Sequence, residues 1–386
     1  MLTKTKDILT IALISLVPTL ILWLPFFLGL ESVLGVPIPQ SGMATVVSNY
    51  DGPLYIAVAK SFYDPQILKT SFAFNLPVEY YAAHFPLFPL LISGFATVLG
   101  NFPYSMLLTT IISSIFCFYF FNKLAGLFVS KKSAVWLTLF FAVFPARWLV
   151  VRSVGSPEPL FIGSIIASMY FFINKKYWWA AIWGVVAQLT KSPGILLFVA
   201  YGVVLLLPSL KHAASTSTKN FVKHFSWKSY PLLLIPLSLL GVFLIYKFRL
   251  NDFWAYFNSG DNVHLFFPPF QIFNYSASWV GTYWLEDIIY LYLLGMVGIY
   301  KLYKQKNFAL FVFVSLFFVI TLFISHRDVA RYALPIVPFL FIAFSKILVK
   351  KEVRYIFLLL LLPIYLFALG FISGNTMQIS DWTPLL

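Results

Sequence analysis

The chain has 386 residues and is 60% hydrophobic, 20% aromatic and only 10% charged, with a mean hydropathy of +0.87. A soluble core of this size cannot hide so much apolar surface, so the composition excludes a soluble protein and predicts that lipid surrounds most of the chain. The net charge of +14 is explained by Lys and Arg in cytoplasmic loops beside anionic lipid, and we expect no nucleic-acid partner. The lone Cys117 excludes a disulfide framework and a thiolate metal cluster.

Apolar segments of helical length predict an all-α, polytopic transmembrane protein, because none of them alternates as a barrel strand does. The first segment follows Lys4 and Lys6 and has no small-residue cleavage site, so we expect a retained helix rather than a signal peptide. Pro86 to Gly100 is expected to form a helix in or near the outer interface. We place about eleven spans near residues 8–30, 103–128, 133–152, 157–173, 177–191, 194–210, 229–248, 281–300, 308–325, 332–348 and 355–373.

The distribution of charge orients these spans. With the N-terminus inside, most of the basic clusters fall on the cytoplasmic side, whereas most acids fall outside. Residues 1–386 then form a single transmembrane domain of the cell membrane, with the candidate active site on the non-cytoplasmic face. Its main connections are a first outer loop at 31–85, a cytoplasmic loop at 211–228 and a second large outer loop at 249–280.

The first outer loop contains the most distinctive acid, Asp51. It precedes a Gly-Pro turn and the helix-like run from Leu54 to Phe62, and aromatic residues surround it in the sequence. An ionisable residue at a membrane edge is a functional candidate. The alternative is an ordinary loop helix whose acids face water.

Three other stretches carry polar groups to the same predicted outer side, at Arg147 to Glu158, at Lys191 and at His326 to Arg331. Cations outside oppose the positive-inside trend, so their grouping near carboxylates suggests a phosphate site, although long basic side chains also extend to headgroups. A carboxylate can act as general base on a hydroxyl while cations stabilise a departing phosphate, as glycosyl transfer from a phosphate-linked sugar requires. The sequence contains no motif of a peptidase, a zinc enzyme or a nucleotide-driven enzyme.

Several motifs in a fixed order carry a resemblance to a known family. They are Tyr50-Asp51-Gly52, Tyr55-Ile56-Ala57, Phe85-Pro86-Leu87-Phe88-Pro89-Leu90-Leu91, Ser156-Pro157-Glu158-Pro159-Leu160-Phe161, Thr190-Lys191-Ser192-Pro193-Gly194 and Arg331-Tyr332 with Leu334-Pro335. Through them the sequence resembles integral-membrane glycosyltransferases of the GT-C superfamily, most of all bacterial and archaeal relatives of the GPI mannosyltransferase that adds the second mannose. The resemblance covers about the first 200 residues well. Tyr50 stands where relatives commonly have Trp, and Lys191 where they have Arg, which keeps the charge but loses the bidentate fork.

This resemblance implies an inverting hexosyltransferase, with mannose as the expected sugar, that uses no metal or cofactor. Its partners would be a polyprenyl-phosphate sugar donor such as dolichyl phosphate mannose, a glycan, glycolipid or protein acceptor, and membrane lipids. Asp51 would be the catalytic base, and the candidate substrate-binding residues are Arg331, Arg327, His326, Lys191, Arg152, Glu158, His84 and Tyr55. The alternatives are a lipid or solute transporter or flippase, for which inverted repeats and charges at the midplane would be expected, and a structural membrane subunit.

Overall fold

The structure is a computed structural model that describes residues 2–215, 226–260, 265–274, 276–277, 282 and 284–386. The predicted all-α architecture is confirmed, since the strands of the described residues are one short antiparallel pair, β1 (Ser32–Val33) and β2 (Val36–Pro37). Most of the predicted cytoplasmic loop 211–228 and parts of the predicted outer loop 249–280 lie outside the described residues.

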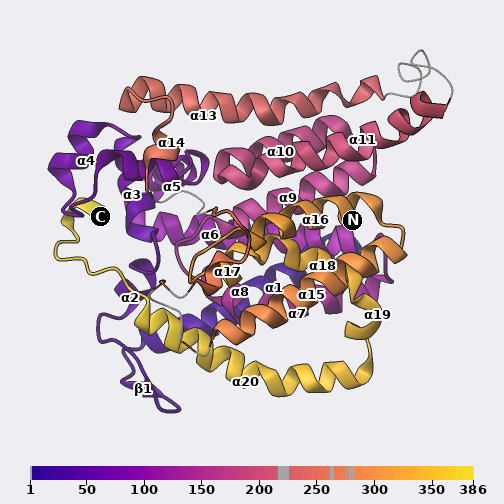
Figure 1. The fold of residues 1–386 in the computed structure, drawn as a ribbon. Helices are drawn as coiled ribbons and strands as arrows, with labels where there is room; N and C mark the ends of the chain where they lie inside the picture. Colours follow the sequence, from indigo (N-terminus) through magenta and orange to yellow (C-terminus); the bar gives the residue numbers. More distant parts are fainter. Residues whose placement is uncertain (1, 216–225, 261–264, 275, 278–281, 283) are drawn as a thin grey trace.

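Long helices stand where most of the apolar segments were predicted. They are α1 (Leu2–Phe27), α6 (Phe102–Ala125), α9 (Glu158–Ile173), α10 (Tyr177–Thr190), α11 (Ile195–Ser215), α13 (Leu234–Leu250), α15 (Leu285–Lys304), α16 (Phe308–Leu322) and α20 (Lys351–Gly374). Figure 1 shows most of them running side by side across the view, with α13 along the upper edge and α20 along the lower one.

Four stretches of the described helices are long and apolar enough to cross a membrane, namely Lys6–Phe27, Phe102–Ala125, Trp227–Leu250 and Lys351–Gly374. Their outer faces stay uncovered by protein: on α20, for example, Leu358, Leu359 and Leu362 are exposed. A row of exposed leucines is unfavourable in water and favourable against hydrocarbon, so the chain is a multi-pass membrane protein. The number of about eleven spans stays a prediction.

Two predicted spans, 133–152 and 332–348, are not continuous helices, which corrects the sequence-based assignment. Proline lacks the backbone N–H that a helix interior needs, and Pro145, Pro335 and Pro338 lie in these segments. The resulting pieces are α7 (Lys131–Val143), α8 (Ala146–Val151), α17 (Val329–Tyr332), the 3₁₀ turn η5 (Leu334–Ile336), α18 (Val337–Ala343) and α19 (Ser345–Leu348). Both interruptions produce short helices, α8 and α17, that each carry a charged residue of the site described below.

The segment between α1 and α6 forms a group of short elements at one end of the bundle, on the left of Figure 1. These elements are α2 (Met43–Val47), α3 (Gly52–Ser61), α4 (Pro65–Ser71), the 3₁₀ helix η1 (Val78–Ala83) and α5 (Leu87–Leu99). The region predicted as interfacial, Pro86 to Gly100, is therefore helical, and α5 packs against α3 and α6. The opposite end of the bundle contains an ion pair at 2.7 Å between Asp7 of α1 and Lys131 of α7.

The chain after α20 returns to this group of short elements. The amide N–H of Met377 donates to the carbonyl of Ser48 at 2.7 Å, and the Asn49 side chain donates to the carbonyl of Ile372 at 2.8 Å. The Asn375 amide also donates to the side-chain oxygen of Asn49 at 3.3 Å. These hydrogen bonds join two parts of the chain that are more than 300 residues apart, immediately beside Asp51.

Candidate active site

Asp51 and Asp64 are the N-cap residues of two consecutive helices, α3 and α4, but their side chains make different contacts. The Asp64 carboxylate caps α4 by accepting hydrogen bonds from the backbone N–H groups of Gln66, at 2.9 Å, and Ile67, at 3.2 Å. Asp51 stands at the N-cap of α3 but makes no capping hydrogen bond. An Asp at the N-cap position of a helix usually accepts hydrogen bonds from backbone N–H groups of the first turn. Asp51 accepts none of these, so it is the exceptional residue of the two. It lines a cavity instead.

Glycine allows the close packing that holds Asp51 in place. A Cβ atom added at Gly52 would lie 2.7 Å from the carbonyl oxygen of Val47 and 3.2 Å from the Met106 side chain. A Cβ atom at Gly155 would lie 2.2 Å from the same methionine. The backbone contact leaves no room for a side chain at Gly52, whereas a side chain at Gly155 would require the flexible Met106 side chain to move. The segment that carries Asp51 and the segment that leads to Glu158 can therefore both close on α6.

Glu158, the first residue of α9, is a buried carboxylate that binds two cations. Its Oε1 atom accepts hydrogen bonds from Arg331 Nε at 2.7 Å and from Lys191 Nζ at 2.8 Å. The Ser156 hydroxyl donates to Oε2. A buried charge is tolerated when opposite charges and hydrogen bonds compensate it, as they do here.

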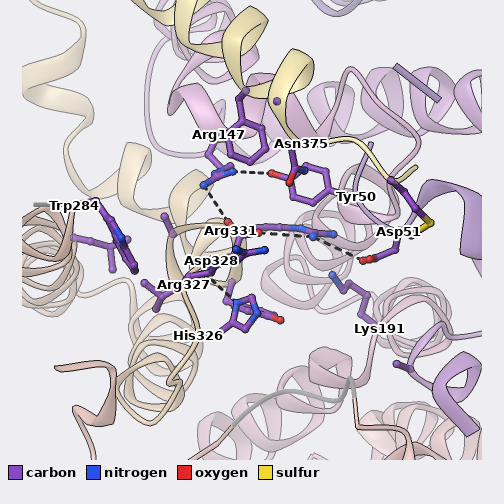
Figure 2. A pocket seen from close by; sticks show the side chains of 18 of the residues that line it. Tyr50, Asp51, Arg147, Lys191, Trp284, His326, Arg327, Asp328, Arg331 and Asn375 are labelled. Atoms are coloured by element: carbon purple, nitrogen blue, oxygen red, sulfur yellow. Dashed lines mark hydrogen bonds and ion pairs between the residues drawn. The ribbon is translucent and has the colours of Figure 1, made fainter. Parts of the chain in front are cut away.

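Arg331, on α17, connects this buried carboxylate to Asp51. Its Nη1 atom lies 3.9 Å from Asp51 Oδ2 and 3.8 Å from Asp328 Oδ2, and its guanidinium lies 4.2 Å from the centre of the Tyr50 ring. Figure 2 shows the guanidinium reaching toward the Asp51 carboxylate. A separation of 3.9 Å gives an ion pair without a hydrogen bond. Arg331 therefore leaves the Asp51 oxygens able to accept a hydrogen bond from a hydroxyl.

Arg147, the second residue of α8, forms the other half of this charged cluster. Its Nη2 atom lies 3.1 Å from Asp328 Oδ1, its Nη1 donates to the Tyr50 hydroxyl at 2.9 Å, and its guanidinium lies 3.8 Å from the centre of the Phe371 ring. Burial raises the pKa of the Tyr50 hydroxyl well above its ordinary value, so the phenol is neutral and accepts this hydrogen bond. Tyr50 also has φ of 49°, a strained conformation for a bulky residue and one that clusters at functional sites.

A cavity of about 1130 Å³ brings these groups together (Figure 2). Asp51 and Lys191 lie on the right of the close-up and Trp284 on the left, with Arg331 between them. The wall includes apolar side chains of α15 and α20, among them Ile288, Leu291, Phe367 and Phe371. The other residues relevant here are Tyr55, His84, Arg147, Tyr256, Asp287, His326, Asp328 and Asn375.

The cavity brings together seven of the nine candidate residues. These are Asp51, Tyr55, His84, Lys191, His326, Arg327 and Arg331. The Tyr55 and His84 rings meet edge to face with centres 4.7 Å apart, and His326 Nδ1 accepts the backbone N–H of Asp328 at 3.0 Å. Glu158 lies behind the wall and reaches the cavity through Lys191 and Arg331.

Arg152 lies elsewhere, completely buried between helices. Its Nε donates to the carbonyl of Ala142 at 2.6 Å, and its Nη1 donates to Ser15 O at 3.0 Å and to Thr19 Oγ1 at 2.8 Å. The guanidinium thus ties α1 to the end of α7. This position does not support the expectation that Arg152 binds substrate, because the residue is completely buried and its Nε and Nη1 donors are directed at oxygens of α1 and α7.

Arg147, Asp328, Asp287 and Asn375 also line the cavity, although they were not among the candidate site residues. The first two stand in the polar stretches that were identified there, so their charge was an available signal. Asp287 is one of two acids in the first turn of α15, a weak signal, and Asn375 follows an apolar helix with no local motif. Among the described residues, no group of three His, Cys, Asp or Glu side chains is arranged to hold a metal ion.

No protein-family model matches the chain, and no curated protein matches it significantly. Solved structures resemble it, however. One is ArnT from Cupriavidus metallidurans bound to undecaprenyl phosphate, with a TM-score of 0.57 and 14% identity over 88% of this chain and 61% of that one. Another is the archaeal oligosaccharyltransferase AglB from Archaeoglobus fulgidus, in complex with an inhibitory peptide and a dolichol-phosphate, with a TM-score of 0.54 and 12% identity over 98% of this chain and 57% of that one.

At such low identity the likeness shows the fold. The predicted all-α, polytopic fold is therefore shared with both structures, and membership of the GT-C superfamily stays a prediction. The chain spans about three fifths of the length of each. The finer resemblance, to relatives of the second-mannose transferase, stays a prediction.

Proposed function

We propose that this protein is an inverting glycosyltransferase that moves a sugar from a polyprenyl-phosphate donor to an acceptor hydroxyl, with Asp51 as the general base. The observation that carries the proposal is that the Asp51 carboxylate makes no helix-capping hydrogen bond and lines the same cavity as four cations, Arg147, Lys191, Arg327 and Arg331. The fold is consistent with it, since one matched structure contains undecaprenyl phosphate and the other dolichol-phosphate.

In the proposed reaction, the Asp51 carboxylate takes the proton of the acceptor hydroxyl. The acceptor oxygen then forms a bond to the anomeric carbon on the face opposite the phosphate, which inverts the configuration there. The bond between that carbon and the phosphate oxygen breaks, and its electron pair stays on the phosphate. Lys191, Arg327 and Arg331 stabilise the charge that develops on the leaving group.

The apolar wall supports a lipid-linked donor. Ile288 and Leu291 of α15 and Phe367 and Phe371 of α20 line the cavity beside the charged groups, so a prenyl chain could lie on one side of a phosphate held by the cations. We further propose that the sugar is mannose, as the family resemblance implies, and that the cavity opens on the non-cytoplasmic face. A cytosolic nucleotide sugar could not reach that face, whereas a lipid-linked sugar can cross the bilayer.

The test supplies purified protein and an acceptor with either a polyprenyl-phosphate mannose or the matching nucleotide sugar. We expect transfer, and release of free polyprenyl phosphate, with the lipid-linked donor alone. Transfer with only the nucleotide sugar would overturn both the donor and the mechanism.

The same assay separates the enzyme from a transporter or flippase. A flippase moves the intact lipid and releases no polyprenyl phosphate, with or without acceptor. Asp51, Lys191 and Arg331 lie where helices end or are interrupted. Transporters also bind substrates at interrupted helices, so the release of polyprenyl phosphate is the observation that decides between the two functions.

A further inference from the structure

The charged groups around the cavity are closely balanced. Three carboxylates form ion pairs with three cations: Glu158 with Lys191 and Arg331, Asp328 with Arg147 and Arg331, and Asp51 with Arg331. Three of the four cations that line the cavity, Arg147, Lys191 and Arg331, are thus already paired with carboxylates before any phosphate arrives. A phosphate must compete with these carboxylates for the same N–H groups.

Building on the function proposed above, we propose that Glu158 acts as a buried counter-charge that limits how tightly Lys191 and Arg331 hold the lipid phosphate, so that the product can leave. Glu158 is then a positioning residue that does not touch the substrate.

The geometry gives Glu158 this role through its position behind the two cations. Its side chain is only 4% exposed, whereas the side chains of Lys191 and Arg331 are 26% and 14% exposed and line the cavity. Each cation therefore presents one side to the cavity and another to the same carboxylate oxygen. Water and salt screen a buried charge poorly, so the negative charge of Glu158 repels any phosphate that binds in front of the two cations.

The charge that moves during the reaction explains why such a limit is useful. The donor is a phosphodiester with one negative charge, and the product is a phosphomonoester that approaches two, while Asp51 gains the acceptor proton. The same cations consequently hold the product more strongly than the donor. Strong retention would make product release limit turnover, and a fixed anion behind the cations weakens that retention without disturbing their placement.

The decisive measurement compares the affinity for polyprenyl phosphate, the product, in wild-type protein and in Glu158→Gln. The amide keeps the shape and the oxygen that accepts from Lys191 and Arg331 but removes the charge. We expect the variant to bind polyprenyl phosphate about 10-fold or more tightly, with a lower KM for the donor and a lower kcat. Glu158→Asp keeps the charge and should stay near the wild-type affinity.

The matched control is Glu286→Gln, which removes one acidic charge from an exposed position of α15 and should leave the affinity unchanged. Unchanged or weaker binding by folded Glu158→Gln would overturn the proposal, and weaker binding is what a direct substrate ligand would give. If Glu158→Gln does not fold, the same comparison is made between Lys191→Gln and the double variant Glu158→Gln/Lys191→Gln. The double variant should then bind polyprenyl phosphate more tightly, and equal or weaker binding would overturn the proposal.

The proposed function and the counter-charge role of Glu158 fail differently. If wild-type protein neither binds nor releases polyprenyl phosphate, the proposed function is wrong and the counter-charge role is wrong with it. If wild-type protein does both and removal of the Glu158 charge does not tighten binding, only the counter-charge role is wrong.

Discussion

Replacing Asp51 with Asn separates catalysis from folding at this position. The amide keeps the size of the side chain but cannot take a proton, and positioned general bases contribute about 10²- to 10⁴-fold to a rate. We therefore expect kcat to fall by about that factor, or by about 3 to 5 kcal/mol on the activation barrier.

The structure predicts that stability will change little. Asp51 caps no helix, and its ion pair with Arg331 spans 3.9 Å while Arg331 keeps its hydrogen bond to Glu158 at 2.7 Å. The Asp51 side chain is also 34% exposed. A partly exposed pair of this kind contributes about 0 to 1 kcal/mol, so the free energy of unfolding should fall by no more than that.

Asp64→Ala is the matched control, because it should have the opposite effects: it removes a helix cap and leaves the proposed general base in place. Loss of its two capping hydrogen bonds should lower stability by about 0.5 to 2 kcal/mol and leave kcat near the wild-type value. Turnover is measured as released polyprenyl phosphate per folded protein, and stability by thermal unfolding in detergent. Near-normal turnover by folded Asp51→Asn would refute the assignment of the general base.

Three further predictions concern packing and topology. Arg152→Met should destabilise the protein by about 1 to 3 kcal/mol, because the buried oxygens that it binds lose their donor, while the folded fraction keeps its kcat. A loss of activity in fully stable protein would instead place Arg152 at the substrate. Gly52→Ala should lower both stability, by about 1 to 3 kcal/mol, and kcat, because the methyl group must displace the segment that carries Asp51; thermal unfolding and turnover together test this, and wild-type values of both would contradict the close packing. Single cysteines at Ser41 and Ser217 in a Cys117→Ala background should react differently with an impermeant reagent on intact cells, the first labelled and the second protected, and the reverse pattern would refute the predicted orientation.

The sequence was sufficient for the helices and for part of the site because both depend on local patterns. Lys191 and Arg331 stand between apolar runs, where a charge is costly unless it has a partner or a function, and both line the cavity. The interruptions at Pro145 and Pro335 were harder to place, since a window of apolar residues keeps its hydropathy through a bend. The break in the helix depends on the missing backbone donor instead.

Other features depend on three-dimensional partners that a sequence does not reveal. Arg152 and Arg147 belong to one polar stretch, but only the structure shows that the first is directed at α1 and the second at Asp328. The sequence predicted Glu158 to be a substrate-binding residue because it is an acid in a polar stretch on the predicted outer side. Its two hydrogen bonds depend on the fold, which brings Lys191 at the end of α10 and Arg331 of α17 to the same carboxylate.

The hydrogen bonds between the chain after α20 and the residues before Asp51 have a consequence for biosynthesis. A ribosome makes Asp51 early, but Phe371 and Asn375, which complete the wall around it, are made more than 300 residues later. Arg147 is made in the first third of that interval, whereas Arg331 and Phe371, which contact Tyr50, are made only near its end. The pocket therefore closes only after α20 has been inserted, and a nascent chain released before that point lacks a complete site.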